Sequence, residues 1–174
     1  MNFKKKVLDF VTYQINDAKR GIDMAKAKKE ISIFHVLAKR IGAFHGIELY
    51  QDDTVVQAVT GSYGHEPNAI FIDGKIVINT AFETIPTEYQ EAIYFHELGH
   101  LQKNHQPNPI LYPIQARLGF GTGLQMEYEA DEFSAMKGAK MLEALEYLKD
   151  LYTNQKTRSV TLRIKRLKEL GNVH

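Results

Sequence analysis

Residues 96–100 read His-Glu-Leu-Gly-His, and this stretch constrains the fold more than any other part of the chain. Side chains four residues apart lie on one face of a helix, so His96 and His100 can bind one metal ion if the segment is helical. Glu97 can then contact a water molecule activated at the ion. The sequence therefore predicts a helix that carries the core of a zinc-dependent hydrolase. A surface helix with two unrelated histidines is the alternative.

The residues before the motif predict where this helix begins. Pro86 and Thr87 are typical of a helix start, with Thr87 as the cap, and Gln90 three residues later completes a capping box. Apolar residues follow at Ala92, Ile93 and Phe95, which indicates that the helix is buried around the site.

A catalytic zinc site needs a third protein ligand. A metzincin would place a histidine six residues after His100, but that position is Gln106, and His105 falls one residue short. His105 is therefore expected to face solvent.

Glu127 and Asp131 are better candidates because they share a helical face. Glu127 could bind zinc, while Asp131 could accept the free ring N–H of a zinc histidine. An acidic, solvated helix face is the alternative.

The motif followed by Glu127-Tyr128-Glu129-Ala130-Asp131 resembles the gluzincin metallopeptidases. In detail it is similar to the E-x-x-A-D motif of the HtpX-like and CaaX-prenyl-protein endopeptidase family. Three other segments resemble that family in order along the chain: residues 67–71, 139–148 and 162–167. The resemblance implies one catalytic zinc held by His96, His100 and Glu127, with Glu97 as general base and Asp131 orienting a ligand.

The resemblance also implies roles outside the two motifs. Arg163 matches the family arginine, which supports the site or stabilises the oxyanion, and an arginine on a helix surface is the alternative. Asn68 and Ala69 begin the edge strand that pairs with an extended peptide substrate. One departure concerns residues 157–159, which read Thr-Arg-Ser where the family usually carries a His-Pro pair. The transition-state role of that histidine therefore cannot be assigned to this chain.

The predicted fold class is α+β: a small, zincin-like, mainly helical domain with a short β-hairpin beside the zinc helix. The hairpin signal is strong, because Asp73-Gly74 separates the apolar runs 69–72 and 75–79, as in a type I′ turn. Helical periodicity is expected over Val7–Ile15 and again over Ile31–Ala43. We therefore expect one domain over residues 1–174, with a helical N-terminal extension (1–60) and a catalytic core (61–174).

Composition narrows the function. The 174 residues contain no cysteine, so the ligands must be histidines and carboxylates, and a reducing cytoplasm is expected. No run of 18 apolar residues is present, so no transmembrane segment is expected. Lys and Arg are concentrated at both ends of the chain, around an acidic middle. We interpret these charges as solvated helix faces and expect no nucleic-acid partner, because no aromatic-interleaved basic motif occurs.

Two other functions remain open. Regulatory peptidases that cleave phage repressors share H-E-L-G-H but usually continue with E-x-x-A-N, and Asp131 argues against them. The other alternative is a zinc-binding module that is non-catalytic, or self-inhibited by the basic N-terminal segment lying in the cleft.

Overall fold

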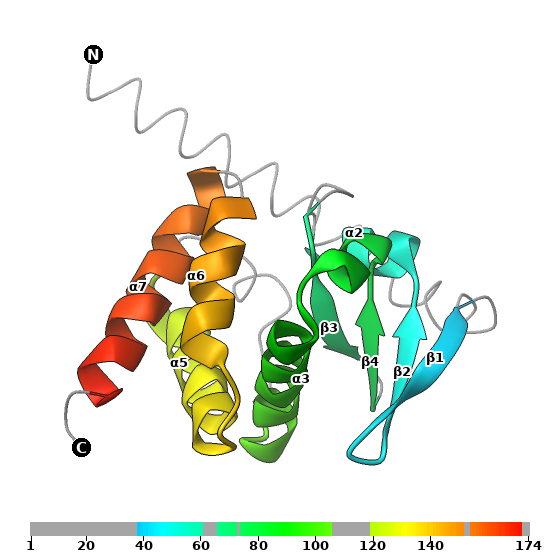
Figure 1. Ribbon diagram of the computed structural model, residues 1–174, viewed down its shortest axis with the longest axis horizontal. Coiled ribbons are helices and arrows are strands. Elements are labelled where there is room, and N and C mark those ends of the chain that lie inside the picture. The colour runs from blue at the N-terminus through cyan, green and yellow to red at the C-terminus, as the bar shows by residue number, and fades with distance from the viewer. Residues whose placement is uncertain (1–37, 61–65, 73, 106–118, 152–153, 172–174) are drawn as a thin grey trace.

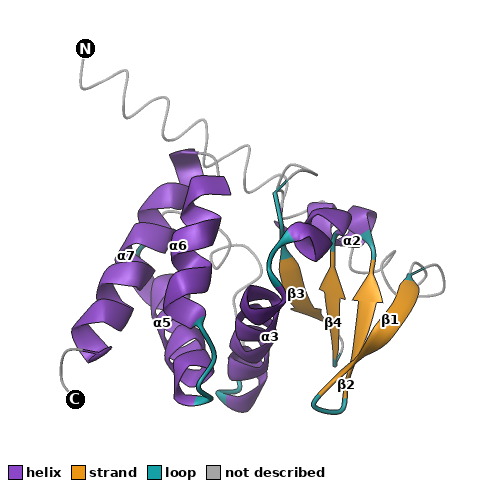
Figure 2. Ribbon diagram, in the orientation of Figure 1, coloured by secondary structure: helices purple, strands orange, loops and turns teal. Residues whose placement is uncertain are grey.

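The computed structural model describes residues 38–60, 66–72, 74–105, 119–151 and 154–171 (Figure 1). The architecture is α+β, with a small sheet on one side and a group of longer helices on the other (Figure 2). The helix expected over Val7–Ile15 lies outside the described residues.

The sheet has four strands: β1 (Lys39–Phe44), β2 (Ile47–Gln51), β3 (Ala69–Ile72) and β4 (Lys75–Ile78). Their order is β1-β2-β4-β3, with β2 and β4 parallel and the two outer pairs antiparallel. The expected hairpin is confirmed, because Ile72 pairs with Lys75 across a two-residue connection. Gly74 adopts φ 75 there, a conformation that glycine reaches without a steric cost. Strand β3 therefore lies at one edge of the sheet.

The helix expected over Ile31–Ala43 is wrong from Lys39 onward, where the chain forms β1. A second hairpin explains the error: His45 and Gly46 both have positive φ, 47 and 83, and reverse the chain directly into β2. A short apolar run fits the helical period and the strand period equally well. Here the pairing of β1 with β2 makes the segment a strand. The expected helical extension up to residue 60 is thus also wrong over residues 39–51, which share a sheet with β3 and β4.

Among the described residues, five helical elements follow the sheet: η1 (Thr80–Thr84), α3 (Thr87–Gln102), α5 (Gly121–Met136), α6 (Met141–Leu151) and α7 (Asn154–Gly171). Helix α3 lies between the sheet and the other three long helices (Figure 1). Its Ile93 packs on the sheet with Ile76 and Ile78, and its Ala92 packs against α6 and α7. The expected burial of this helix is confirmed, since α3 lies at the centre of the described core.

The opposite face of the sheet is covered by α2 (Asp53–Thr60). Val55 and Val56 of α2 pack on Ile70 and Val77. Ile76 and Ile78 point the other way, toward α3, because neighbouring residues of a strand face opposite sides of a sheet. The position of α3 over the sheet is therefore fixed by this alternation.

The start of α3 differs from the predicted capping box. Thr87 is the first helical residue and Pro86 precedes it as the cap, without a side-chain hydrogen bond. Gln90 instead donates from Nε2 to the carbonyl oxygen of Ile85, at 2.9 Å. The predicted cap at Thr87 is wrong by one residue, because the extended ψ of 140 at Pro86 lets the helix begin immediately after it.

Asn79 joins the start of β3 to the end of β4. Its buried side chain accepts from the backbone N–H groups of Asn68 (2.9 Å) and Phe82 (3.1 Å), and it donates to the carbonyl of Glu66 (2.7 Å). An Asn79→Leu substitution removes all three hydrogen bonds at constant side-chain bulk. We expect it to lower the free energy of unfolding by about 2–4 kcal/mol.

Urea denaturation measures this effect of Asn79→Leu. The matched control is Thr84→Ala, which deletes an exposed hydroxyl bonded to the carbonyl of Ala81 and should change the stability by less than about 0.5 kcal/mol. Equal stability of the two variants would contradict the linking role of Asn79.

Candidate metal centre

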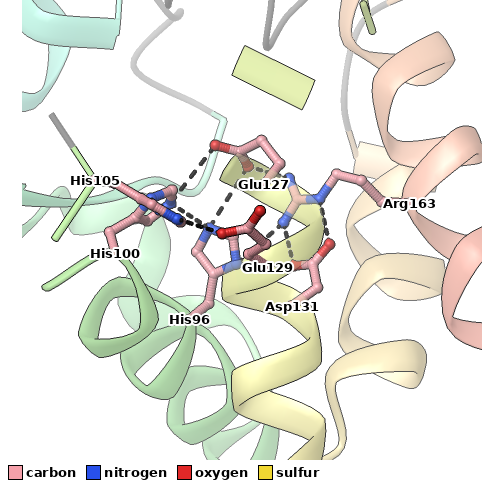
Figure 3. A network of polar contacts seen from close by, with 7 residues as sticks. All are labelled: His96, His100, His105, Glu127, Glu129, Asp131 and Arg163. Carbon is pink, nitrogen blue, oxygen red and sulfur yellow. Dashed lines mark hydrogen bonds and ion pairs between the residues drawn. The ribbon is translucent and has the colours of Figure 1, made fainter. Parts of the chain in front are cut away.

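Helices α3 and α5 pack closely together and bring three potential ligands into one cluster (Figure 3). Nε2 of His96 lies 3.1 Å from Nε2 of His100. The Glu127 carboxylate lies 3.5 Å from the first nitrogen and 3.6 Å from the second. His96 and Glu127 are buried and His100 is nearly so. The three side chains are therefore close enough to hold a metal ion, as the two sequence motifs predict.

Gly99 permits this close approach of the two helices. A Cβ atom at position 99 would lie 2.9 Å from Cα of Ala130 and 3.1 Å from its carbonyl oxygen. Both of these are backbone atoms of α5, so no side-chain movement could make room. The glycine inside the first motif and the alanine inside the second thus form the contact point between the two helices.

Asp131 fixes the ring of His96. Its Oδ1 lies 2.8 Å from Nδ1 of His96, and both groups are buried. A carboxylate accepts hydrogen bonds, so Nδ1 carries the proton and Nε2 presents a lone pair to the cluster. Burial lowers the pKa of His96, but the hydrogen bond and the charge of Asp131 outweigh it, and the pKa is raised. The sequence-based role of Asp131 as an orienting residue agrees with this contact.

Arg163 of α7 contacts both carboxylates of the site (Figure 3). Its Nε and Nη2 donate to the two oxygens of Asp131 at 2.7 and 2.6 Å, and Nη1 lies 2.8 Å from Glu127. Burial favours the neutral acids, but the guanidinium outweighs it, lowering the pKa of Asp131 to about 2 and that of Glu127 below its usual range. Of the two roles that the resemblance implies for Arg163, these contacts favour support of the site.

Glu97 lies buried on α3 between the two histidines in sequence. Burial raises the pKa of this carboxyl to about 7, against the opposing effects of His96 and of a backbone hydrogen bond from Phe71. Phe71 belongs to β3, so the Glu97 carboxylate faces the edge strand. A carboxyl group with a pKa near neutrality can both accept and return a proton.

The substrate residues expected from the sequence lie at the start of β3. Asn68 turns its backbone toward β4, because its N–H and carbonyl both bond to Asn79. Backbone groups alternate in an antiparallel pair, so those of Ala69 and Phe71 point away from β4. The outer edge of β3 therefore presents Ala69 and Phe71, and Asn68 faces the sheet.

His105 lies elsewhere than the sequence predicts. The expected solvent-facing position is wrong: the side chain is only 7% exposed, and Nδ1 lies 2.9 Å from Nδ1 of His100. It is not one of the clustered ligands among the described residues. The spacing of His105 in the sequence already argued against a ligand role. Its contact with His100 could not be predicted in the same way, because that contact depends on how the chain turns after α3.

The donor set itself fits a cation. Burial lowers the pKa of His100 to about 3, so this ring is neutral. Two imidazole nitrogens 3.1 Å apart cannot both present a bare lone pair to the other, so either a hydrogen or a metal ion lies between them. Imidazole and carboxylate together suit zinc and similar transition metals.

Comparison of the chain with protein-family models, curated proteins and solved structures finds no match. In the part of the chain that the structure describes, no helix has both the length and the apolar character needed to cross a bilayer.

The charged surface carries ion pairs, including Arg166 with Glu132 and Lys168 with Glu146, which agrees with the interpretation of solvated helix faces.

Arg163 gives a prediction about stability. Replacing it by methionine keeps much of the side-chain volume but leaves Asp131 and Glu127 as buried carboxylates without their cation. We expect Arg163→Met to destabilise the metal-free protein by about 3–5 kcal/mol in urea denaturation. Arg166→Met, on the same helix, removes a more exposed ion pair and should cost less than about 1 kcal/mol. Similar losses in both variants would refute the structural importance of the Arg163 contacts.

Proposed function

We propose that this protein is a zinc-dependent endopeptidase of the gluzincin type. His96, His100 and Glu127 hold the zinc ion, and Glu97 is the general base. The observation that carries the proposal is the convergence of the three ligands beside a buried glutamate whose pKa is near neutrality. The order of the residues in the two motifs supports it.

The spacing of the ligand atoms supports zinc. At a zinc–ligand distance of about 2.0–2.1 Å, the corners of a tetrahedron lie about 3.3–3.4 Å apart. The two Nε2 atoms lie 3.1 Å apart, and each has a different oxygen of Glu127 near it, Oε2 at 3.5 Å from His96 and Oε1 at 3.6 Å from His100. Three protein ligands also leave one position for water or substrate, as catalytic zinc sites require.

Each residue around the site has a chemical task. When bound, zinc supplies Lewis acidity that lowers the pKa of a water molecule and polarises the scissile carbonyl. Glu97 accepts a proton from that water as its oxygen bonds to the carbonyl carbon, and it gives the proton to the leaving nitrogen as the C–N bond breaks. Asp131 keeps the proton of His96 on Nδ1, so that Nε2 remains a ligand.

Strand β3 offers a place for the substrate. Its outer edge carries the backbone groups of Ala69 and Phe71, and Phe71 also contacts Glu97. An extended peptide could add to this edge as a fifth strand and place its carbonyl near the general base. Main-chain pairing of this kind binds peptides without demanding a strict sequence. The proposed substrate is therefore an extended segment of a peptide or protein.

Metal removal tests the proposal directly. We expect the purified protein to contain about one zinc ion per chain and to cleave casein or a quenched fluorescent peptide. Dialysis against a chelator should abolish the cleavage, and zinc should restore it. A protein that binds no zinc at all would overturn the proposal.

The same assay separates the alternatives. A shortened chain that begins at residue 38 retains every described strand and helix, whereas a cut at residue 60 would remove β1 and β2 from the sheet. Cleavage by only the shortened chain would favour self-inhibition by the N-terminal segment. Zinc binding without cleavage by either chain would favour a non-catalytic binding module.

A further inference from the structure

After α3 the chain turns so that His105 lies against His100, one of the three clustered potential ligands. Lys103 and Asn104 donate their backbone N–H groups to the carbonyls of Gly99 and Leu101, and His105 donates to the carbonyl of His100, each at 3.0 Å. Asn104 adopts φ 51, the left-handed conformation in which helices commonly end and which asparagine tolerates better than most residues. This turn brings the ring of His105 against the ring of His100, with centroids 5.0 Å apart.

His105 forms two polar contacts there (Figure 3). Nδ1 lies 2.9 Å from Nδ1 of His100, and Nε2 lies 3.0 Å from Oε2 of Glu129 on α5. Gln125, one turn earlier on α5, donates to the other oxygen of Glu129 at 2.9 Å. His105 is thus held between the second ligand histidine and a carboxylate of the neighbouring helix.

These contacts determine the tautomer of each ring. The Glu129 carboxylate accepts, so Nε2 of His105 carries a proton, and in the neutral ring Nδ1 of His105 then presents a lone pair to His100. That lone pair can only accept, so Nδ1 of His100 must donate to it. Nε2 of His100 is then left without a proton and faces His96 and Glu127 as a ligand.

We propose that His105, held by Glu129, is the positioning residue for His100, just as Asp131, held by Arg163, positions His96. The proposal rests on the metal site of the proposed function. Each ligand histidine of α3 then has its own hydrogen-bonded partner, one from α5 and one from the turn after α3. The two partners fix both rings with Nε2 directed at the same point.

Two substitutions distinguish positioning from packing. His105→Asn places an amide oxygen where Nδ1 stood, so it still accepts from His100, although it loses ring volume. His105→Phe keeps the ring volume but has no acceptor. If His105 only fills space, His105→Phe should disturb the site less than His105→Asn. If His105 positions His100, His105→Asn should disturb the site less than His105→Phe. Gln102→Ala, an exposed residue at the end of α3, is the control.

Zinc affinity, measured by competition with a chromophoric chelator, gives the first readout. We expect His105→Phe to bind zinc about 10- to 100-fold more weakly, and His105→Asn to stay within about threefold of the unaltered protein. Proton NMR of the zinc-bound protein gives the second. The unaltered protein should show exchange-protected Nδ1–H signals for both His96 and His100, and His105→Phe should lose the protection of one signal only.

The outcomes separate this inference from the proposed function. Unchanged zinc affinity and unchanged Nδ1–H protection in His105→Phe would overturn the positioning role while leaving a zinc peptidase intact. Tight zinc binding that depends on His105, without peptide cleavage, would support the positioning role and refute the peptidase. A chain that binds no zinc would refute both. Thermal unfolding of the metal-free variants confirms that each one is folded.

Discussion

The Glu97→Gln protein is expected to bind zinc as the unaltered chain does and to lose peptide cleavage by about 10²–10⁴-fold. Glutamine has nearly the shape of glutamate and can retain the contact with Phe71 through its amide oxygen. It cannot accept a proton from water and return it to the leaving nitrogen. Because Glu97 is not one of the three clustered ligands, the loss should fall on the chemical step and not on metal binding.

Zinc content and the cleavage rate of a quenched peptide, measured on the same preparation, test this prediction. Glu91→Gln is the matched control, because it makes the same chemical change on the exposed side of α3. It should leave both quantities unchanged. Full cleavage by Glu97→Gln would refute the general-base assignment, and loss of zinc would show that Glu97 belongs to the ligand set.

The second large effect is expected from Gly99→Ala. The added Cβ would lie 2.9 Å from Cα of Ala130, 3.1 Å from its carbonyl oxygen and 3.2 Å from Cβ of Phe133. Alanine favours a helix over glycine by about 1 kcal/mol, yet this contact forces α3 and α5 apart. We expect a net destabilisation of about 1–3 kcal/mol, the usual cost of overpacking.

The same displacement should weaken metal binding, because the ligands are divided between the two helices. His96 and His100 move with α3, whereas Glu127 moves with α5. We expect zinc affinity to fall by about tenfold or more, as for other losses of ligand orientation. Gly42→Ala is the control, since a Cβ there meets no atom within 4 Å. Unchanged zinc affinity in Gly99→Ala would show that the spacing of the helices is not critical.

The local parts of the site could be predicted from the sequence. The pairs His96 with His100 and Glu127 with Asp131 are each four residues apart, and helical geometry alone places each pair on one face. The β3–β4 hairpin was predictable for a similar reason, because Asp73-Gly74 between apolar runs is a short-range signal. Each of these predictions depends on fewer than about a dozen neighbouring residues.

The first hairpin was missed because its signal is weaker. His45-Gly46 is a less common turn than Asp-Gly, and the apolar residues before it fit a helical period as well as a strand. Strand β1 is stabilised by pairing with β2, and β2 by its parallel pairing with β4, about 27 residues away along the chain. A pattern of neighbouring residues cannot predict this pairing of β2 with β4, because the two strands are far apart in the sequence.

Local sequence patterns are enough to predict the helix of the first motif, the two pairs of potential ligands and the hairpin beside them, since these depend on the fixed periods of helices and strands. Three contacts are seen only in the folded chain: Arg163 with the two carboxylates, Phe71 with Glu97, and His105 with His100. Those contacts join segments whose meeting depends on the packing of α3 against β3, α5 and α7. Side-chain packing between distant segments has no sequence period, so the ligands were predictable and most of the residues that position them were not.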